Sequence, residues 1–271
     1  MVAQAQKPKD AGSKPRELSV LFIGNSYTWF NNLPHLVEAL AKSAHEPRLR
    51  TRMVVGPGAT LKSHWDAGAA LEAVQSEKWD YVILQDQSSL GLPVTVSKGK
   101  GQFNPRLFHE FARRFDAAIR PTGAKTLFFL TWARADSPED QDGLTEAYRQ
   151  IATELADGIA PVGLAWKTAL EERPALLLHQ GDLSHPSPAG SYLAACVLYS
   201  VLYGKSSEGL TARISADAAG IPDRAMTVNQ PGGLVQLSGV NLPPADARFL
   251  QTVAWRVAQA EAAATHVIMR E

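Results

Sequence analysis

The chain has 271 residues, of which 45% are hydrophobic and 20% charged, a composition typical of a globular protein with a substantial core. Its 27 Lys and Arg residues balance 27 Asp and Glu residues, so no net positive charge points to nucleic acid or an anionic membrane. The single cysteine, Cys196, allows no disulfide within the chain. The sequence contains no apolar run of about 18 residues, so we expect no membrane span.

Residues 1–17 are polar and rich in Lys, Pro and Ala, which predicts a disordered N-terminal tail. The segment lacks the apolar stretch of a signal peptide, although a tail of this composition often follows one that has been removed. We therefore favour an extracytoplasmic location, periplasmic or secreted, over a cytoplasmic one, and leave the compartment open.

From residue 18 onward, short apolar segments alternate with segments of helical periodicity. Strands are predicted at 18–24, 49–55, 79–85 and 125–132, with a short fifth strand within 158–166, and helices at 33–44, 60–77, 105–120 and 143–156. This alternation predicts an α/β fold with about five mostly parallel strands and helices on both faces of the sheet. We expect residues 18–271 to form one domain, with a long irregular excursion at 205–243 and a C-terminal helix at 244–263.

The residues that follow the predicted strands form the candidate site, because ligands of open α/β sheets bind beyond the carboxyl ends of the strands. These strand ends read Gly24-Asn25-Ser26, Gly56-Pro57-Gly58, Gln85-Asp86-Gln87-Ser88 and Thr131-Trp132-Ala133-Arg134. We expect all four at one edge of the sheet, where Ser26 is the candidate nucleophile.

Residues 181–190, GDLSHPSPAG, supply the partners that a serine nucleophile needs. Asp182 and His185 are three residues apart, so the carboxylate can reach Nδ1 of the imidazole while Nε2 faces Ser26. Ser187 and Pro188 suit the N-cap and first turn of the following helix, and a helix start there fixes the position of the loop.

The reaction of such a serine also requires hydrogen-bond donors for an oxyanion. The backbone N–H groups of Ser26 and Gly58 are candidates, since glycine allows close approach of the backbone. The side-chain amide of Gln87 is the third candidate, and Gln85 is the alternative.

Taken together, these features resemble the SGNH (GDSL-like) hydrolase superfamily, over residues 18 to about 204. The resemblance rests on FIGNSYT at 22–28, a glycine after the second strand, a polar cluster after the third and Asp-x-x-His near the C-terminal end. It implies a three-layer α/β/α, flavodoxin-like fold and an esterase, lipase or carbohydrate acetylesterase activity. It also implies a catalytic triad of Ser26, His185 and Asp182 and an oxyanion hole, with neither a metal nor an organic cofactor.

The sequence departs from this family in two motifs. Asn25 replaces the usual Asp of Gly-Asp-Ser, and QDQS stands where Gly-x-Asn-Asp is usual, so that Gln87 occupies the position of the Asn donor. Asn25, Trp132 and Arg134 are candidate substrate-binding residues, with Trp132 as a pocket wall and Arg134 as a contact to an anion or hydroxyl. The alternative for the last two is core packing and a surface charge.

We therefore expect a serine esterase that cleaves short acyl esters, acetyl esters above all, from a small molecule or an acylated carbohydrate. One alternative is a catalytically silent module that binds a sugar or a phosphate at the same strand ends. Another is an acyltransferase that uses the same triad. A metal site at His179, Asp182 and His185 is disfavoured, because no further His or Cys cluster completes it. The oligomeric state stays open.

Overall fold

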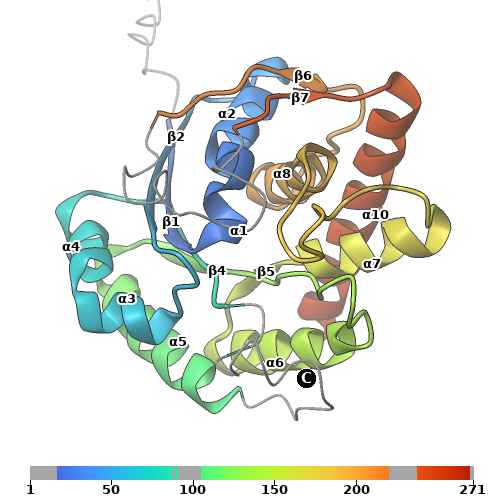
Figure 1. Cartoon of the computed structure of the whole chain (residues 1–271). Coiled ribbons are helices and arrows are strands. Elements are labelled where there is room, and N and C mark those ends of the chain that lie inside the picture. The colour runs from blue at the N-terminus through green and yellow to red at the C-terminus, as the bar shows by residue number, and fades with distance from the viewer. Residues whose placement is uncertain (1–16, 88–89, 91–104, 220–236, 269–271) are drawn as a thin grey trace, which may run out of the picture.

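The computed structural model describes residues 17–87, 90, 105–219 and 237–268 (Figure 1). Its central sheet has the strand order β2-β1-β3-β4-β5, and every neighbouring pair is parallel. The strands are β1 (Leu18–Gly24), β2 (Leu49–Val55), β3 (Tyr81–Leu84), β4 (Lys125–Phe129) and β5 (Gly158–Ala160). With β1 between β2 and β3, this is the flavodoxin-like order, and the expected fold class is confirmed.

Helices cover both faces of the sheet, because successive side chains of each strand point to opposite faces. In β1, Val20 and Phe22 pack into one core, whereas Leu21 and Ile23 pack into the other. Figure 1 shows the two helical layers on either side of the sheet. The first layer contains α2 (Leu33–Ser43), α7 (Val162–Glu172), α8 (Pro188–Tyr203) and α10 (Pro244–Ile268), and the second contains α3 (Leu61–Ala67), α4 (Ala69–Ser76), α5 (Arg106–Ile119) and α6 (Asp140–Leu155).

The structure divides one predicted helix and gives the bounds of the short fifth strand. The helix expected at 60–77 is broken into α3 and α4 at Gly68, whose φ of +76° is a left-handed conformation that glycine adopts at little cost. The short strand expected within 158–166 is β5, which ends at Ala160, and α7 begins at Val162, so the rest of that apolar segment belongs mainly to a buried helical face.

The remaining elements lie outside the three layers or join them. In the excursion expected at 205–243, β6 (Arg213–Ile214) pairs antiparallel with β7 (Val240–Asn241). Residues 220–236 of this excursion and residues 1–16 of the expected N-terminal tail lie outside the described residues. The short 3-10 helix η2 (Arg120–Thr122) links α5 to β4. Across the described residues, no helix is long and apolar enough to cross a membrane.

Two short helices follow β1 and carry the chain into α2. These are α1 (Ser26–Trp29) and the 3-10 helix η1 (Phe30–Asn32). Asn31 and Asn32 have φ values of +53° and +50°, a left-handed conformation that Asn adopts more readily than most residues. The resulting kink separates α1 from α2, and all seven residues from 26 to 32 are buried.

Candidate active site

Ser26 lies at the carboxyl end of β1 as the first residue of α1. The side chain of Asn25 caps this helix, because its Oδ1 accepts a hydrogen bond from the N–H of Tyr27 at 3.1 Å. Ser26 is only 6% exposed, and its Oγ lies 2.9 Å from Nε2 of His185. The first strand therefore ends by directing the serine hydroxyl at an imidazole from a distant loop.

The side chain of Gln85 holds the turn that precedes Ser26. Its Oε1 accepts hydrogen bonds from the N–H of Asn25 and from Oγ1 of Thr28, both at 2.9 Å, and its Nε2 donates to the carbonyl of Asp86. A Cβ atom on Gly24 would lie 2.5 Å from both Gln85 Oε1 and Thr28 Oγ1. The strand thus ends on glycine because the Gln85 amide occupies the space of a side chain.

The loop before α8 brings Asp182 to His185. Oδ2 of Asp182 accepts a short hydrogen bond from Nδ1 of His185, and Oδ1 accepts from the N–H groups of Ser184 at 3.0 Å and His185 at 2.9 Å. Partial burial alone would raise the pKa of Asp182, but these hydrogen bonds outweigh it and lower the pKa. The carboxylate is therefore ionised at neutral pH and fixes the imidazole with its Nε2 toward Ser26.

No protein-family model matches the sequence, and no curated protein matches it either. A candidate SGNH hydrolase of known structure from Slackia heliotrinireducens is 26% identical, covering 69% of this chain and 100% of that chain with a TM-score of 0.54. The chain has the SGNH hydrolase fold.

Two further solved structures share this SGNH fold. A DUF4886 family protein from Bacteroides uniformis is 17% identical, covering 90% of this chain and 95% of that chain with a TM-score of 0.61. A variant of an acetyl-xylooligosaccharide esterase from Geobacillus is also 17% identical, covering 67% of this chain and 92% of that chain with a TM-score of 0.54. The fold is therefore one that esterases use.

Asn25, for which the sequence predicted a contact with substrate, has a supporting position in this SGNH fold. Its side chain is 3% exposed, and besides capping α1 its Nδ2 donates to the carbonyls of Ala59 at 3.0 Å and Asp86 at 3.5 Å. The usual Asp of the family motif could not donate these two hydrogen bonds. Asn at this position thus ties the strand ends of β2 and β3 to the turn that carries Ser26.

The three oxyanion-donor candidates follow β1, β2 and β3. Gly58 has a φ of +58°, and no atom lies within 4 Å of the position of its missing Cβ. Gln87 is half-buried, and its N–H donates to Oδ1 of Asp86 at 2.6 Å. Gln85 has 0% exposure and both ends of its amide are hydrogen-bonded, so its geometry is that of a structural residue.

Asp86 links two of these strand ends. Its Oδ2 accepts from the N–H of Leu61 at the start of α3, while its Oδ1 accepts from Gln87. Burial of the carboxyl group, which is 3% exposed, raises the pKa of Asp86 to about 6, although the two backbone hydrogen bonds act in the opposite direction. Sequence reasoning gave Asp86 no role, because its neighbours in space are distant along the chain.

Trp132 is buried beneath the loop that carries His185, which corrects the expectation that it forms a pocket wall. Its side chain is 0% exposed and lies in a stack of three rings, 4.3 Å from Tyr27 and 4.1 Å from Trp166 between centroids. Its Nε1 donates to the carbonyl of Ser184 at 3.0 Å. Trp132 therefore supports the loop that carries His185.

Arg134 lies at the edge of the same loop. Its Nη2 donates to the carbonyl of Asp182 at 3.3 Å, and its Nε donates to Asp136 at 3.0 Å. The next residue, Ala135, donates its N–H to the carbonyl of Leu183 at 2.8 Å. Leu183 has a φ of +63°, which is strained for leucine, and the strained turn is held by these contacts.

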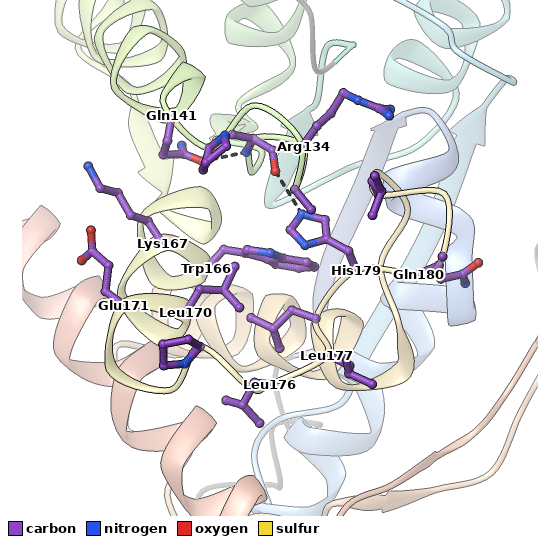
Figure 2. A pocket seen from close by; sticks show the side chains of 17 residues that line it. Arg134, Gln141, Trp166, Lys167, Leu170, Glu171, Leu176, Leu177, His179 and Gln180 are labelled. Carbon is purple, nitrogen blue, oxygen red and sulfur yellow. Dashed lines mark hydrogen bonds between the residues drawn. The ribbon is translucent and has the colours of Figure 1, made fainter. Parts of the chain in front are cut away.

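A pocket of about 680 Å³ lies beside this loop (Figure 2). Its lining is mainly apolar and includes Arg134, Trp166, Leu170, Leu176, Leu177 and Leu183. Leu177 and Leu183 are 80% and 44% exposed, unusual values for leucine. Neither Ser26 nor His185 lines the pocket, whereas Gln180, Gly181 and Leu183, from the loop that carries Asp182 and His185, do.

The alternative of a metal site at His179, Asp182 and His185 gains no geometric support. Nε2 of His179 donates to the carbonyl of Ala133 at 3.0 Å, and Figure 2 shows this bond at the pocket. Within the part of the chain that the structure describes, no group of three or more His, Cys, Asp or Glu side chains could hold a metal ion.

Proposed function

We propose that this protein is a serine esterase that hydrolyses short acyl esters, acetyl esters above all, through an acyl-enzyme on Ser26. The observation that carries the proposal is the continuous hydrogen-bonded chain from Ser26 Oγ through His185 to the Asp182 carboxylate. These three hydrogen-bonded side chains lie at the carboxyl edge of a parallel sheet in a fold that esterases use. His185 is thus within hydrogen-bond reach of both the nucleophile and the orienting carboxylate.

In the first step, Ser26 Oγ attacks the ester carbonyl carbon while His185 Nε2 accepts its proton. Asp182 holds the imidazole through Nδ1 and stabilises the imidazolium that forms. The N–H groups of Ser26 and Gly58 and the amide of Gln87 donate to the oxyanion. When the tetrahedral intermediate collapses, the bond to the alcohol oxygen breaks and His185 returns the proton to that oxygen.

In the second step, water replaces the alcohol. His185 accepts a proton from water as its oxygen attacks the acyl carbon, and the resulting oxyanion uses the same donors. Collapse releases the carboxylic acid, and Ser26 recovers its proton from His185. The atoms balance with ester and water as the reactants and acid and alcohol as the products.

A carbohydrate is the candidate alcohol part of the substrate. The Geobacillus protein that shares this fold is described as an acetyl-xylooligosaccharide esterase, and another protein with the same fold, at a TM-score of 0.52, as an acetyl xylan esterase. Both are under 20% identical to this chain, so they support the substrate class by analogy of fold alone.

Mass spectrometry of the intact protein after incubation with a fluorophosphonate tests the nucleophile. We expect one adduct on the parent protein and none on Ser26→Ala, with Ser206→Ala as the serine control that keeps the adduct. Turnover of p-nitrophenyl acetate should fall by at least about 10⁴-fold in Ser26→Ala, because only binding and oxyanion donors remain.

Two other outcomes would support a different function. A parent protein with no adduct and no turnover supports the silent binding module, for which a thermal-shift screen with sugars and phosphorylated ligands is the next step. An adduct with acyl transfer to an added alcohol that outpaces hydrolysis supports the acyltransferase. Turnover retained by Ser26→Ala would exclude Ser26 as the nucleophile.

A further inference from the structure

The imidazole of His185 has an aromatic ring stacked on its face. The ring of Phe30 lies 4.2 Å from the imidazole between centroids, with an angle of 14° between the two planes. Phe30 is 4% exposed, so the stack lies in the buried part of the site. A near-parallel ring at this distance restrains rotation of the imidazole about the bond that joins it to the chain.

Phe30 is fixed in this position by the segment that carries the nucleophile. It follows α1 as its C-cap, and its backbone N–H donates to the carbonyl of Ser26. Its ring also packs at 6.3 Å from that of the fully buried Trp29. One short segment therefore places both the serine that His185 contacts and the ring that covers His185.

The effect of this stack on a protonated imidazole depends on which other groups contact the ring. Within the described residues, the groups that contact the ring are Asp182 at Nδ1, Ser26 at Nε2, the face of Phe30 and the edge of Tyr27. Asp182 is the one charged group among these four. A proton taken up by His185 thus creates a cation that faces the negative face of a π-system on a side without solvent.

We propose that Phe30 is a positioning residue, whose ring face holds the His185 imidazole between Ser26 and Asp182 and stabilises the imidazolium formed in each acyl-transfer step. The proposal rests on the proposed esterase function. Because the imidazolium exists only after the base has accepted a proton, the stack strengthens toward the transition state. Its loss should therefore lower kcat and leave KM unchanged.

The test compares Phe30→Leu with Phe30→Tyr and Phe115→Leu. Leucine keeps the site apolar but removes the ring face, and tyrosine keeps the face. Phe115 is equally buried, at 0% exposure, but packs into the opposite core against Trp65, so it controls for general loss of packing.

We expect kcat for p-nitrophenyl acetate to fall by about 2- to 30-fold in Phe30→Leu at constant KM, the range of a cation–π interaction. The acid limb of the kcat/KM profile should move by roughly 0.4 to 1.5 pH units to lower pH, since the imidazolium is less stable. Phe30→Tyr should restore both values, and Phe115→Leu should change neither.

An NMR titration of the His185 ring in the parent and in Phe30→Leu measures the same shift without turnover. An unchanged titration midpoint, or an equal change in Phe115→Leu, would overturn the role of Phe30. A midpoint that falls in a protein with neither adduct nor ester turnover would support the stack and contradict the esterase. The two proposals therefore fail separately.

Discussion

Gln85 and Gln87 lie two residues apart at the end of β3, and the structure gives their side chains different surroundings. The Gln85 amide is buried and bonded to Asn25, Thr28 and Asp86, whereas Gln87 is half-buried at the strand end. We expect Gln87→Ala to lower kcat by roughly 10² to 10³ at nearly constant KM, the loss typical of an oxyanion donor. Steady-state kinetics with p-nitrophenyl acetate measures it.

Gln85→Ala is the matched comparison for this prediction. It leaves the N–H of Asn25 and the hydroxyl of Thr28 without their acceptor, so the free energy of unfolding should fall by about 1–3 kcal/mol. Gln87→Ala should leave that free energy within about 0.5 kcal/mol of the parent. A full loss of kcat in Gln85→Ala, with none in Gln87→Ala and no change in stability, would move the donor to Gln85.

For single residues, the sequence predicted the contacts made within short motifs but not those made between distant strand ends. The spacing of Asp182 and His185 indicated their contact, because three residues in a loop allow little else once the imidazole faces a serine. Asn25 and Trp132 were expected to contact substrate, whereas in the structure both are buried and donate hydrogen bonds to backbone carbonyls. A buried amide or indole at a strand end has the same sequence signal as an exposed one, and only tertiary packing distinguishes them.

The junction between β1 and α1 is the element that the site depends on most. Gly24 has no room for a methyl group, since its Cβ would lie 2.5 Å from the amide oxygen of Gln85 and from the hydroxyl oxygen of Thr28. Gly24→Ala should therefore displace Gln85, lower the free energy of unfolding by about 1–3 kcal/mol and reduce kcat as Ser26 shifts. Urea denaturation and ester kinetics measure the two effects.

Gly56→Ala, at the end of the neighbouring strand, is the control for stability. A Cβ there would meet the Cβ of Ala59 at 3.4 Å, an ordinary contact, so the free energy of unfolding should stay close to that of the parent. Equal stability of the parent and Gly24→Ala would show that Gln85 can move aside, and would remove the steric reason for glycine at position 24.

Among the elements, apolar periodicity sufficed for the five strands and the helices between them, because each element has its own buried face. The break at Gly68 was missed, since a helix interrupted by one left-handed glycine keeps the same periodic pattern. The two-residue strands β6 and β7 give no periodic signal at all. The stack of Phe30 on His185 joins two residues that lie far apart in the chain, a contact that residue types alone do not specify.

For the molecule as a whole, the buried carboxyl group of Asp86 should make folding stability depend on pH. Its pKa is about 6 in the folded protein, against an ordinary value of 3.8, because burial disfavours the charged form. The folded state therefore binds this proton more tightly than the unfolded chain. The stabilisation that results is complete below pH 3.8 and is lost as the pH rises through 6.

Asp86→Asn isolates this contribution. An asparagine keeps one acceptor for the N–H groups of Leu61 and Gln87. Because asparagine does not titrate, its own contribution to the free energy of unfolding does not depend on pH. Asp157, whose pKa burial raises to about 7, is present in both proteins, so its effect cancels in the difference between them. The difference in unfolding free energy between parent and variant thus reports the titration of Asp86 alone.

We expect this difference to shift in favour of the variant by on the order of 2 kcal/mol between pH 4 and pH 7, given about 1.4 kcal/mol for each unit of pKa shift. Urea denaturation of both proteins at half-unit pH steps measures it. A difference that stays constant over this range would mean that Asp86 titrates alike in the folded and unfolded states. The hydrogen bonds that the carboxylate accepts from Leu61 and Gln87 would then offset the effect of its burial, and Asp86 would contribute no pH dependence to the stability of the fold.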